Sequence, residues 1–265
     1  MDGGTAEVRQ ARMVALVAED GFVRVADASL LLGVSEVTVR SDLAMLQHAG
    51  LIRRVHGGAM PVPGPPRESS VEATAQRDAE TKQAIGRRAA ALVSSGSSIL
   101  LDVGSTTLAV AHALVERIDL VDLVVVTNGL SIALALEAAI PRFTVVVTGG
   151  TLRALQHSLV NPMAAQSLAS LHVDLAVLGC NGIDEEGRVT NINLPEAEVK
   201  RAMIAASDRR MLVADSSKVG GRHLGLIGGL EEFGTWVTES APSPQVHAVC
   251  DTFGTTVVVA DRRGV

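Results

Sequence analysis

The sequence predicts an α/β protein of two domains, a small helical domain that ends in a β-hairpin and a larger domain with a mostly parallel sheet. Three features predict this division: short helical periodicities in the first fifty residues, four prolines among residues 61–66, and a later alternation of apolar strand-like and helix-like runs. A chain of 265 residues can bury one small and one larger core. We therefore place the domains at 1–60 and 75–265, with a proline-rich linker at 61–74.

The first fifty residues predict three short helices. Apolar residues recur at helical spacing over residues 8–18 and again over 25–32, where Gly33 ends the run. Ser35 then stands at an N-cap position, and a third helix continues to Gly50 with an apolar face made of Val39, Leu43 and Leu46. Two helices joined by so short a turn are typical of a helix-turn-helix, whose second helix can enter the major groove of duplex DNA.

A β-hairpin wing is expected after the third helix. Residues 51–56 are short and β-prone, and Gly57 and Gly58 supply the turn. The wing and the polar face of the third helix carry groups that can bind base edges or phosphates. The candidate DNA-binding residues are Ser35, Glu36, Thr38, Arg40, Ser41, Arg53, Arg54 and His56. A helical bundle with a solvated polar face is the alternative, and the order of turn, glycine-ended helix and arginine-bearing wing favours DNA.

Charge and composition limit the nucleic-acid partner. A formal net charge of −6 argues against a protein that coats nucleic acid nonspecifically. With four Phe, one Trp and no Tyr, the chain lacks the stacking platforms typical of single-strand and RNA-binding modules. Within residues 1–60, six arginines face seven carboxylates, so we expect affinity for a duplex operator to need two or more copies, that is, a homo-oligomer.

The remaining compositional features point to a soluble, cytoplasmic protein without a membrane partner. The N-terminus has no apolar signal region, and no apolar run reaches the roughly 18 residues of a membrane span. Cys180 and Cys250 are far apart and form no C-x-x-C motif, so neither a disulfide framework nor a zinc site is expected. No sequence motif indicates a cofactor.

After the linker, the pattern alternates between helices and strands. Helices are expected at 80–93, 107–116, 131–139, 162–171, 195–206 and 243–250. Strands are expected at 98–101, 123–126, 143–147, 173–178, 211–213 and 255–259. Unbroken Val, Leu and Ile strands indicate a Rossmann-like, mostly parallel sheet covered on both faces.

Small polar residues cluster where the expected strands end. The loop 102–107 follows the first strand, and its glycine and hydroxyl groups suit a phosphate that meets the start of a helix. Similar stretches follow other strands at 127–129, 148–150 with Arg153 nearby, 179–182 and 215–218. Ordinary turns and helix caps explain any one of these loops. Their recurrence at one sheet edge favours a ligand site.

The N-terminal residues resemble a known family. The stretch VSEVTVRSDL from Val34 and the stretch GLIRRVHGGA from Gly50 closely resemble the DNA-binding domain of the DeoR family of bacterial transcription regulators. That family usually carries two adjacent arginines before the Asp-Leu pair, whereas here Arg40 is followed by Ser41.

Residues 75–261 resemble the C-terminal domain of the same family, which is similar in fold to ribose-5-phosphate isomerase and senses phosphorylated sugars. The resemblance implies that the phosphate is held by Asp102, Gly104, Ser105, Thr106 and Thr107. It implies a pocket lined by Thr127, Asn128, Gly150, Arg153 and Lys218. Glu196 and Lys200 match a further family segment and could position sugar hydroxyls, form an oligomer contact or make a simple i,i+4 pair. Asn161 stands where the family commonly has glycine.

The function expected from these features is a transcriptional regulator, a repressor of carbohydrate-metabolism genes that a phosphorylated sugar releases from its operator. A sugar-phosphate isomerase-like enzyme is the alternative, since Asp102, Glu196, Asp215 and Lys218 could supply acid and base groups. A winged helix that binds protein instead of DNA is a third possibility.

Overall fold

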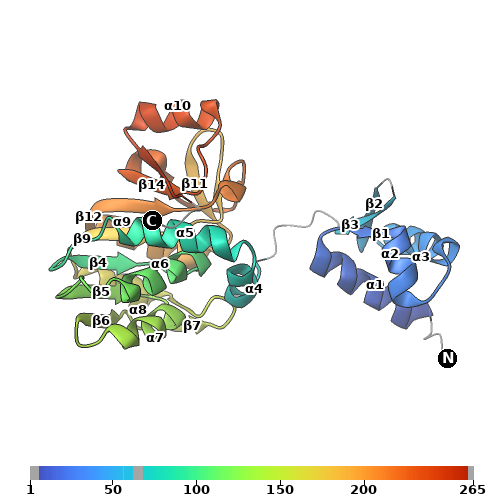
Figure 1. The fold of residues 1–265 in the computed structure, drawn as a ribbon, viewed down its shortest axis with the longest axis horizontal. Coiled ribbons are helices and arrows are strands. Elements are labelled where there is room, and N and C mark those ends of the chain that lie inside the picture. The colour runs from blue at the N-terminus through green and yellow to red at the C-terminus, as the bar shows by residue number, and fades with distance from the viewer. Residues whose placement is uncertain (1–5, 56, 62–67, 262–265) are drawn as a thin grey trace. The chain divides into compact units, whose positions relative to one another are not determined.

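The computed structural model describes residues 6–55, 57–61 and 68–261 and divides the chain into two compact units, residues 1–67 and 68–265 (Figure 1). The first described residue of the second unit is Glu68, and helix α4 (Val71–Gln76) follows it within the same unit. This helix begins inside the stretch 61–74 that the sequence analysis assigned to a linker and ends two residues beyond it. Its N-cap is Ser70, whose hydroxyl accepts a hydrogen bond from the amide of Ala73 at 3.2 Å.

The first unit is a three-helix domain with a small antiparallel sheet. Its elements are α1 (Ala6–Asp20), β1 (Val23–Arg24), α2 (Val25–Leu32), α3 (Glu36–His48), β2 (Ile52–Val55) and β3 (Gly58–Pro61). The three predicted helices and the wing are confirmed. The strand β1 was missed because it has only two residues, and it pairs with β3, giving the order β1-β3-β2. A Cβ on Gly58 would lie 2.2 Å from the carbonyl oxygen of Val23, so this close pairing requires glycine.

The core of the second unit is a seven-stranded sheet with the order β15-β14-β12-β9-β4-β5-β6, and every pair in it is parallel. The strands are β4 (Ser98–Leu101), β5 (Leu123–Thr127), β6 (Phe143–Val147), β9 (Val173–Leu178), β12 (Ser207–Val213), β14 (Thr235–Thr238) and β15 (Thr256–Val259). Ile99 and Leu101 pack into one apolar cluster and Leu100 into another, as expected for a sheet buried on both faces.

Helices cover both faces of this sheet. Residues of α5 (Ala79–Ala90), α6 (Ser105–Glu116) and α7 (Leu130–Leu136) pack in one cluster, and those of α8 (Pro162–Ala169), α9 (Leu194–Ala205) and α10 (Pro244–Phe253) in the other. The predicted mostly parallel α/β fold is confirmed. No helix among the described residues is long and apolar enough to cross a membrane.

Several short strands were not predicted. A hairpin is formed by β7 (Thr151–Arg153) and β8 (Ser158–Val160), and a separate antiparallel sheet by β10 (Gly182–Ile183), β11 (Arg188–Asn191) and β13 (Gly225–Gly229). Strand β14 of the main sheet was also missed. These strands have two to five residues, too few to establish a periodicity. Short 3-10 turns complete the unit at η1 (Glu137–Ala139), η2 (Ser216–Lys218) and η3 (Leu230–Glu232).

Helices α5 and α6 approach each other most closely at Gly86, where a Cβ would lie 2.5 Å from the carbonyl oxygen of Ala109. In an open helix, replacing glycine by alanine stabilises by about 1 kcal/mol. We expect Gly86→Ala to destabilise instead, because the new methyl group would force the backbone of α5 or α6 to move. The free energy of unfolding of the second unit should fall by about 1–3 kcal/mol. The measurement is urea unfolding followed by the fluorescence of Trp236, the single tryptophan, which is buried in this unit.

The control is Gly234→Ala, since a Cβ there meets no atom within 4 Å. An unchanged unfolding midpoint for Gly86→Ala would contradict the close helix contact.

Candidate functional site

Helix α3 is set in place by its N-cap and its apolar face. The hydroxyl of Ser35 accepts a hydrogen bond from the amide of Thr38 at 3.2 Å and lies 2.9 Å from the Thr38 hydroxyl. Gly33 has a φ of 66°, which ends α2 and allows the turn between the helices. The side chains of Val39, Leu43 and Leu46 are buried against the other helices. The opposite face of α3 is therefore presented outward.

That outward face carries the residues expected to bind DNA. Glu36, Arg40 and Ser41 are exposed, and the guanidinium of Arg40 contacts the Glu36 carboxylate at 2.7 Å. Exposed pairs of this kind contribute at most about 1 kcal/mol, so Arg40 can exchange this partner for a phosphate or a base at little cost. Arg53 and Arg54 are exposed on β2 of the wing. His56 lies outside the described residues.

One residue of α3 has a structural role that the sequence did not indicate. The carboxylate of Asp42, 2% exposed, accepts hydrogen bonds from Arg9 at 2.6 and 3.2 Å and from Gln10 at 2.9 Å. Burial by itself would raise the pKa of Asp42, but these hydrogen bonds and the charge of Arg9 hold the pKa below its ordinary value. The hydrogen bonds from Arg9 and Gln10 to Asp42 therefore hold α3 against α1.

In the second unit, the loops at the carboxyl ends of the parallel strands carry the predicted ligand-binding residues. Asp102, directly after β4, is fully buried and forms an ion pair with the buried ammonium of Lys200 on α9. The same carboxylate accepts a hydrogen bond from the amide of Gly179 at 3.1 Å, and Lys200 donates to the carbonyl of Gly179 at 3.1 Å. Burial raises the pKa of Asp102, and Lys200 opposes that rise. Asp102 thus lies beneath the loop as a brace.

The loop after Asp102 exposes unused hydrogen-bonding groups. Gly104 has a φ of 140°, and helix α6 begins at the next residue. The hydroxyl of Thr107 donates to the carbonyl oxygen of Gly104 at 2.9 Å and is buried. By contrast, the hydroxyls of Ser105 and Thr106 make no hydrogen bond to any other described residue. Together with the free amides of the first helical turn, they can donate to an oxyanion.

The residues after β5 brace neighbouring loops. The side-chain oxygen of Asn128 accepts from the amide of Val103 at 3.2 Å, and its amide donates to the carbonyl of Leu159 at 3.3 Å. The hydroxyl of Thr127 accepts from the amide of Gly129 at 3.0 Å. Both side chains are buried. Asn128 thereby connects the loop 102–107 to the β7–β8 hairpin.

The hairpin lies tightly against the helix that follows it. Gly150 has a φ of 124°, and a Cβ there would lie 2.7 Å from the carbonyl oxygen of Val160. Asn161, where the family commonly has glycine, keeps a φ of 69° and a ψ of −176°, a conformation that glycine adopts most readily. The substitution therefore leaves the backbone of this loop in the region that glycine favours.

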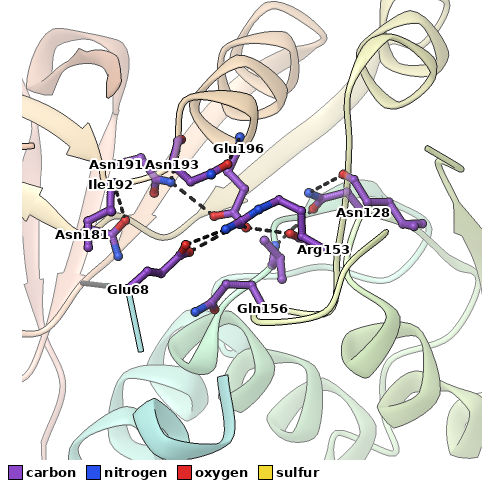
Figure 2. A network of polar contacts seen from close by, with 12 residues as sticks. Glu68, Asn128, Arg153, Gln156, Asn181, Asn191, Ile192, Asn193 and Glu196 are labelled. Atoms are coloured by element: carbon purple, nitrogen blue, oxygen red, sulfur yellow. Dashed lines mark hydrogen bonds and ion pairs between the residues drawn. The ribbon is translucent and has the colours of Figure 1, made fainter. Parts of the chain in front are cut away.

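Arg153, on the same hairpin, is held between two carboxylates. Its guanidinium contacts Glu68 at 2.6 Å and also pairs with Glu196 of α9, and Figure 2 shows both carboxylates converging on it. Glu196 accepts a further hydrogen bond from the hydroxyl of Ser158 at 2.6 Å. The i,i+4 pair between Glu196 and Lys200 that sequence spacing allowed is wrong, because Glu196 pairs with Arg153 and Lys200 with Asp102.

Lys218 lies beyond β12 in η2, and its ammonium makes no hydrogen bond or ion pair with another described residue.

Lys82 of α5, which the sequence analysis missed, is buried and donates to the carbonyl of Arg77. Burial lowers the pKa of Lys82, opposed by the charge of Asp215 and reinforced by that of Lys218. The signal for Lys82 was available, since it falls three residues before Ile85 on the apolar face of its helix.

Cys180 is half-buried and lies near the charged side chains just described. Burial raises the pKa of its thiol to about 12, and the charges of Lys200, Lys218, Asp215 and Asp102 act on it as well. Its thiol is therefore protonated and is no nucleophile at neutral pH.

Three buried polar atoms at this sheet edge have no hydrogen-bond partner among the described residues: Oδ1 of Asp102, Oδ2 of Asp215 and Nδ1 of His223. Unsatisfied buried polar atoms are costly, and they gather where a ligand supplies the missing partner. No group of three or more His, Cys, Asp or Glu in the described part of the chain is arranged to hold a metal ion. The free hydroxyls of Ser105 and Thr106, the first amides of α6 and the ammonium of Lys218 can each donate to a small oxyanion.

A winged helix with an outward-facing polar helix, in the same chain as an α/β unit with a polar sheet edge, defines a ligand-responsive DNA-binding regulator. Comparison with known proteins gives the family. Residues 9–62 match the DeoR-like helix-turn-helix domain and residues 77–240 match the DeoR C terminal sensor domain. The chain belongs to the DeoR family of DNA-binding transcription regulators, and the resemblance seen in the sequence is confirmed.

Relatives match over most of their length. The HTH-type transcriptional regulator GlpR of Haloferax volcanii is 35% identical over 250 residues, which cover 94% of this chain and 96% of the relative. The transcriptional repressor CsqR of Escherichia coli is 34% identical over 90% of this chain and 89% of its own. The glycerol-3-phosphate regulon repressor of the same species is 30% identical over 89% and 92%.

Among solved structures, ribose 5-phosphate isomerase from Plasmodium falciparum matches with a TM-score of 0.38 and 18% identity over 52% of each chain. Ribose 5-phosphate isomerase from Methanocaldococcus jannaschii matches with a TM-score of 0.39 and 17% identity over 52% of this chain and 53% of its own.

The bond between Asp42 and Arg9 makes a testable contribution to the first unit. Since the folded-state pKa of Asp42 lies below the unfolded value of about 3.9, its stabilisation is complete above about pH 4 and is lost as the pH falls through the folded pKa. We expect Asp42→Asn to lower the stability of α1 and α3 by about 1–3 kcal/mol at pH 7 and by much less near pH 2. Hydrogen exchange of the amides of these helices measures the difference.

Asp27→Asn is the control, because Asp27 is an exposed aspartate in the same unit. Equal loss for Asp42→Asn at both pH values would show that the ionised carboxylate does not stabilise the fold.

Proposed function

We propose that this regulator is a cytoplasmic, homo-oligomeric repressor of carbohydrate-metabolism genes, and that a phosphorylated sugar bound in the second unit releases it from its operator. The observation that carries the proposal is the set of hydrogen-bond donors without protein partners at the sheet edge, namely Ser105, Thr106 and Lys218. Ser105 and Thr106 open helix α6, where an anion is favoured by the helix dipole, and Lys218 supplies a positive charge. The relative named as the glycerol-3-phosphate regulon repressor supports the same effector class.

Helix α3 would read the operator from the major groove, and the wing would bind phosphates. The residues assigned to these contacts are Ser35, Glu36, Thr38, Arg40, Ser41, Arg53 and Arg54, together with His56, which lies outside the described residues. Six arginines against seven carboxylates in residues 1–60 give the unit no excess positive charge. One copy would therefore bind weakly, and a homo-oligomer that places two copies on adjacent half-sites supplies the missing affinity.

The residues assigned to the effector divide by their role. Ser105, Thr106 and Lys218 would donate to the phosphate, and Arg153 would face the rest of the ligand. Gly104 and Gly150 allow the backbone to approach closely, while the buried side chains brace the loops from below. These braces are Asp102, Thr107, Thr127 and Asn128.

Release requires that the effector bind one arrangement of the protein more tightly than the other. The ratio of these two affinities limits how far the effector can lower the affinity of the protein for its operator.

The isomerase-like alternative is not favoured. An acid-base enzyme needs a carboxylate that can exchange protons with its substrate. Here Asp102 is committed to Lys200, and Glu196 is committed to Arg153 and Ser158. The relatives are named as transcriptional regulators. Incubation with candidate sugar phosphates should therefore give stoichiometric binding without steady product formation.

Arginine substitutions test the DNA-binding face. We expect Arg40→Ala to weaken binding to the upstream region of its own gene by roughly 5–150-fold, the range for a lost base contact of about 1–3 kcal/mol. Arg53→Ala with Arg54→Ala should weaken binding and lower the slope of log affinity against log salt by about 2, one for each phosphate contact. A gel-shift titration at several salt concentrations measures both effects.

Arg12→Ala serves as the control, because Arg12 is an exposed arginine on α1 and belongs neither to α3 nor to the wing. Unchanged affinity for all variants on α3 and the wing would reject the assignment.

Substitutions in the second unit test the effector site. Thr106→Ala and Lys218→Ala should still bind operator DNA, because they lie in the other compact unit, but should resist release by the sugar phosphate that releases the unmodified chain. Loss of a charge-assisted hydrogen bond costs about 1.5–3 kcal/mol, which corresponds to roughly 10–150-fold more effector. The measurement is the loss of the gel shift as sugar phosphate is added, with Thr252→Ala on α10 as control. Normal release of both variants would show that the phosphate binds elsewhere.

A further inference from the structure

Glu68 joins the linker side of the second unit to its ligand site. It is the first described residue of this unit and follows directly on the proline-rich segment in sequence. Its side chain is nevertheless only 10% exposed, because its carboxylate lies on the guanidinium of Arg153, at 2.6 Å for one oxygen and 3.5 Å for the other (Figure 2). Arg153 is 21% exposed. Both groups therefore remain partly open to a ligand.

The residues after Glu68 are fastened to the same hairpin. Gln156 donates to the carbonyl of Ser69 at 2.5 Å, and the amide of Val71 donates to the carbonyl of Leu155 at 3.0 Å. These contacts fix the backbone near Glu68, so its carboxylate is held in position before any ligand arrives. A positioned side chain loses less entropy on binding than a free one.

Charge gives the two ends of the site different ligand preferences. One guanidinium between two carboxylates leaves an excess negative charge around Arg153, which disfavours a phosphate. Lys218, by contrast, makes no ion pair with a carboxylate among the described residues, and the hydroxyls of Ser105 and Thr106 have no hydrogen-bond partner there. A phosphorylated ligand would therefore place its phosphate at Lys218 and its uncharged end at Arg153.

The two carboxylates differ in what they can still accept. Oε1 of Glu196 already accepts from Arg153 and Ser158, and its Oε2 accepts from Asn191 at 3.3 Å. The Glu68 carboxylate has Arg153 as its only hydrogen-bond partner among the described residues. An ionised carboxylate offers about four acceptor positions, so Glu68 retains free ones. A carboxylate beside a guanidinium presents acceptors and donors together, which suits neighbouring hydroxyl groups.

We propose that Glu68 is a specificity-determining residue of the effector site, whose carboxylate accepts hydrogen bonds from hydroxyl groups of the effector at the end away from its phosphate. This inference rests on the proposed function and assigns the effector's orientation and a further contact. Because Glu68 adjoins the linker in the chain, effector binding would also strengthen the attachment of the linker's end to the second unit.

The test compares Glu68→Gln with the unmodified full chain by isothermal titration calorimetry. The probes are inorganic phosphate, which has no hydroxyl-bearing end, and a panel of glycerol 3-phosphate, ribose 5-phosphate, glucose 6-phosphate, fructose 1-phosphate and fructose 6-phosphate. Glutamine keeps the size of the side chain but loses its charge and one acceptor. For each panel member that the unmodified chain binds, we expect the Kd of Glu68→Gln to be about tenfold higher or more. Its Kd for inorganic phosphate should be no higher than that of the unmodified chain.

The matched control is Glu72→Gln. Glu72 is an exposed glutamate in the same segment that contacts His157 of the hairpin at 3.4 Å and not Arg153. Its Kd values for phosphate and for the panel should stay within about twofold of those of the unmodified chain.

Each outcome separates this inference from the proposed function. Equal affinity of Glu68→Gln and the unmodified chain for the sugar phosphates would overturn the inference and leave the proposed function standing. A parallel loss of inorganic phosphate binding would also overturn it, since Glu68 would then only support the fold of the site. If no member of the panel bound the unmodified chain, the proposed function and this inference would both be rejected.

Discussion

The buried ion pair between Asp102 and Lys200 is the constraint on which the proposed effector site depends. Both groups are almost fully removed from water, which costs several kcal/mol per ion unless each is paired and hydrogen-bonded. Their shared contacts with Gly179 connect the ends of β4 and β9 to helix α9. With α9 fixed, Glu196 is fixed one turn earlier, and through it Arg153 and the β7–β8 hairpin. This pair of charges therefore links the loop 102–107, through α9, to the β7–β8 hairpin.

The sequence was sufficient where structure is set locally. Strands β4, β6 and β9 were predicted to the residue, because each is a short, mostly apolar run between turn signals. The cap at Ser35 was predicted from its position. The partners of charged residues could not be predicted, because they are far apart in the chain: Lys200 lies 98 residues from Asp102, and Arg153 lies 43 from Glu196 and 85 from Glu68. Sequence spacing offers only the i,i+4 partner, which here is the wrong one.

The two candidate sites differ in the same way. The DNA-binding face follows from one helix and one hairpin, so periodicity alone identifies which side chains point outward. The effector site is assembled from the ends of several strands, and a residue there can be a free donor or a buried brace. Thr106 and Thr107 are adjacent and chemically identical, yet only Thr107 donates to Gly104. That distinction depends on helix α6 and its neighbours, which local sequence does not encode.

The packing of the second unit also limits how a ligand can act on the rest of the chain. The seven-stranded sheet is buried between two apolar clusters, and close-packed interiors do not deform continuously. A small effector is therefore expected to act through elements outside these clusters. The β7–β8 hairpin is such an element, because it forms a two-stranded sheet of its own, carries Arg153 into the site and holds residues 68–71. The proposed route from effector to linker would then need one hairpin and one carboxylate, and no rearrangement of the sheet.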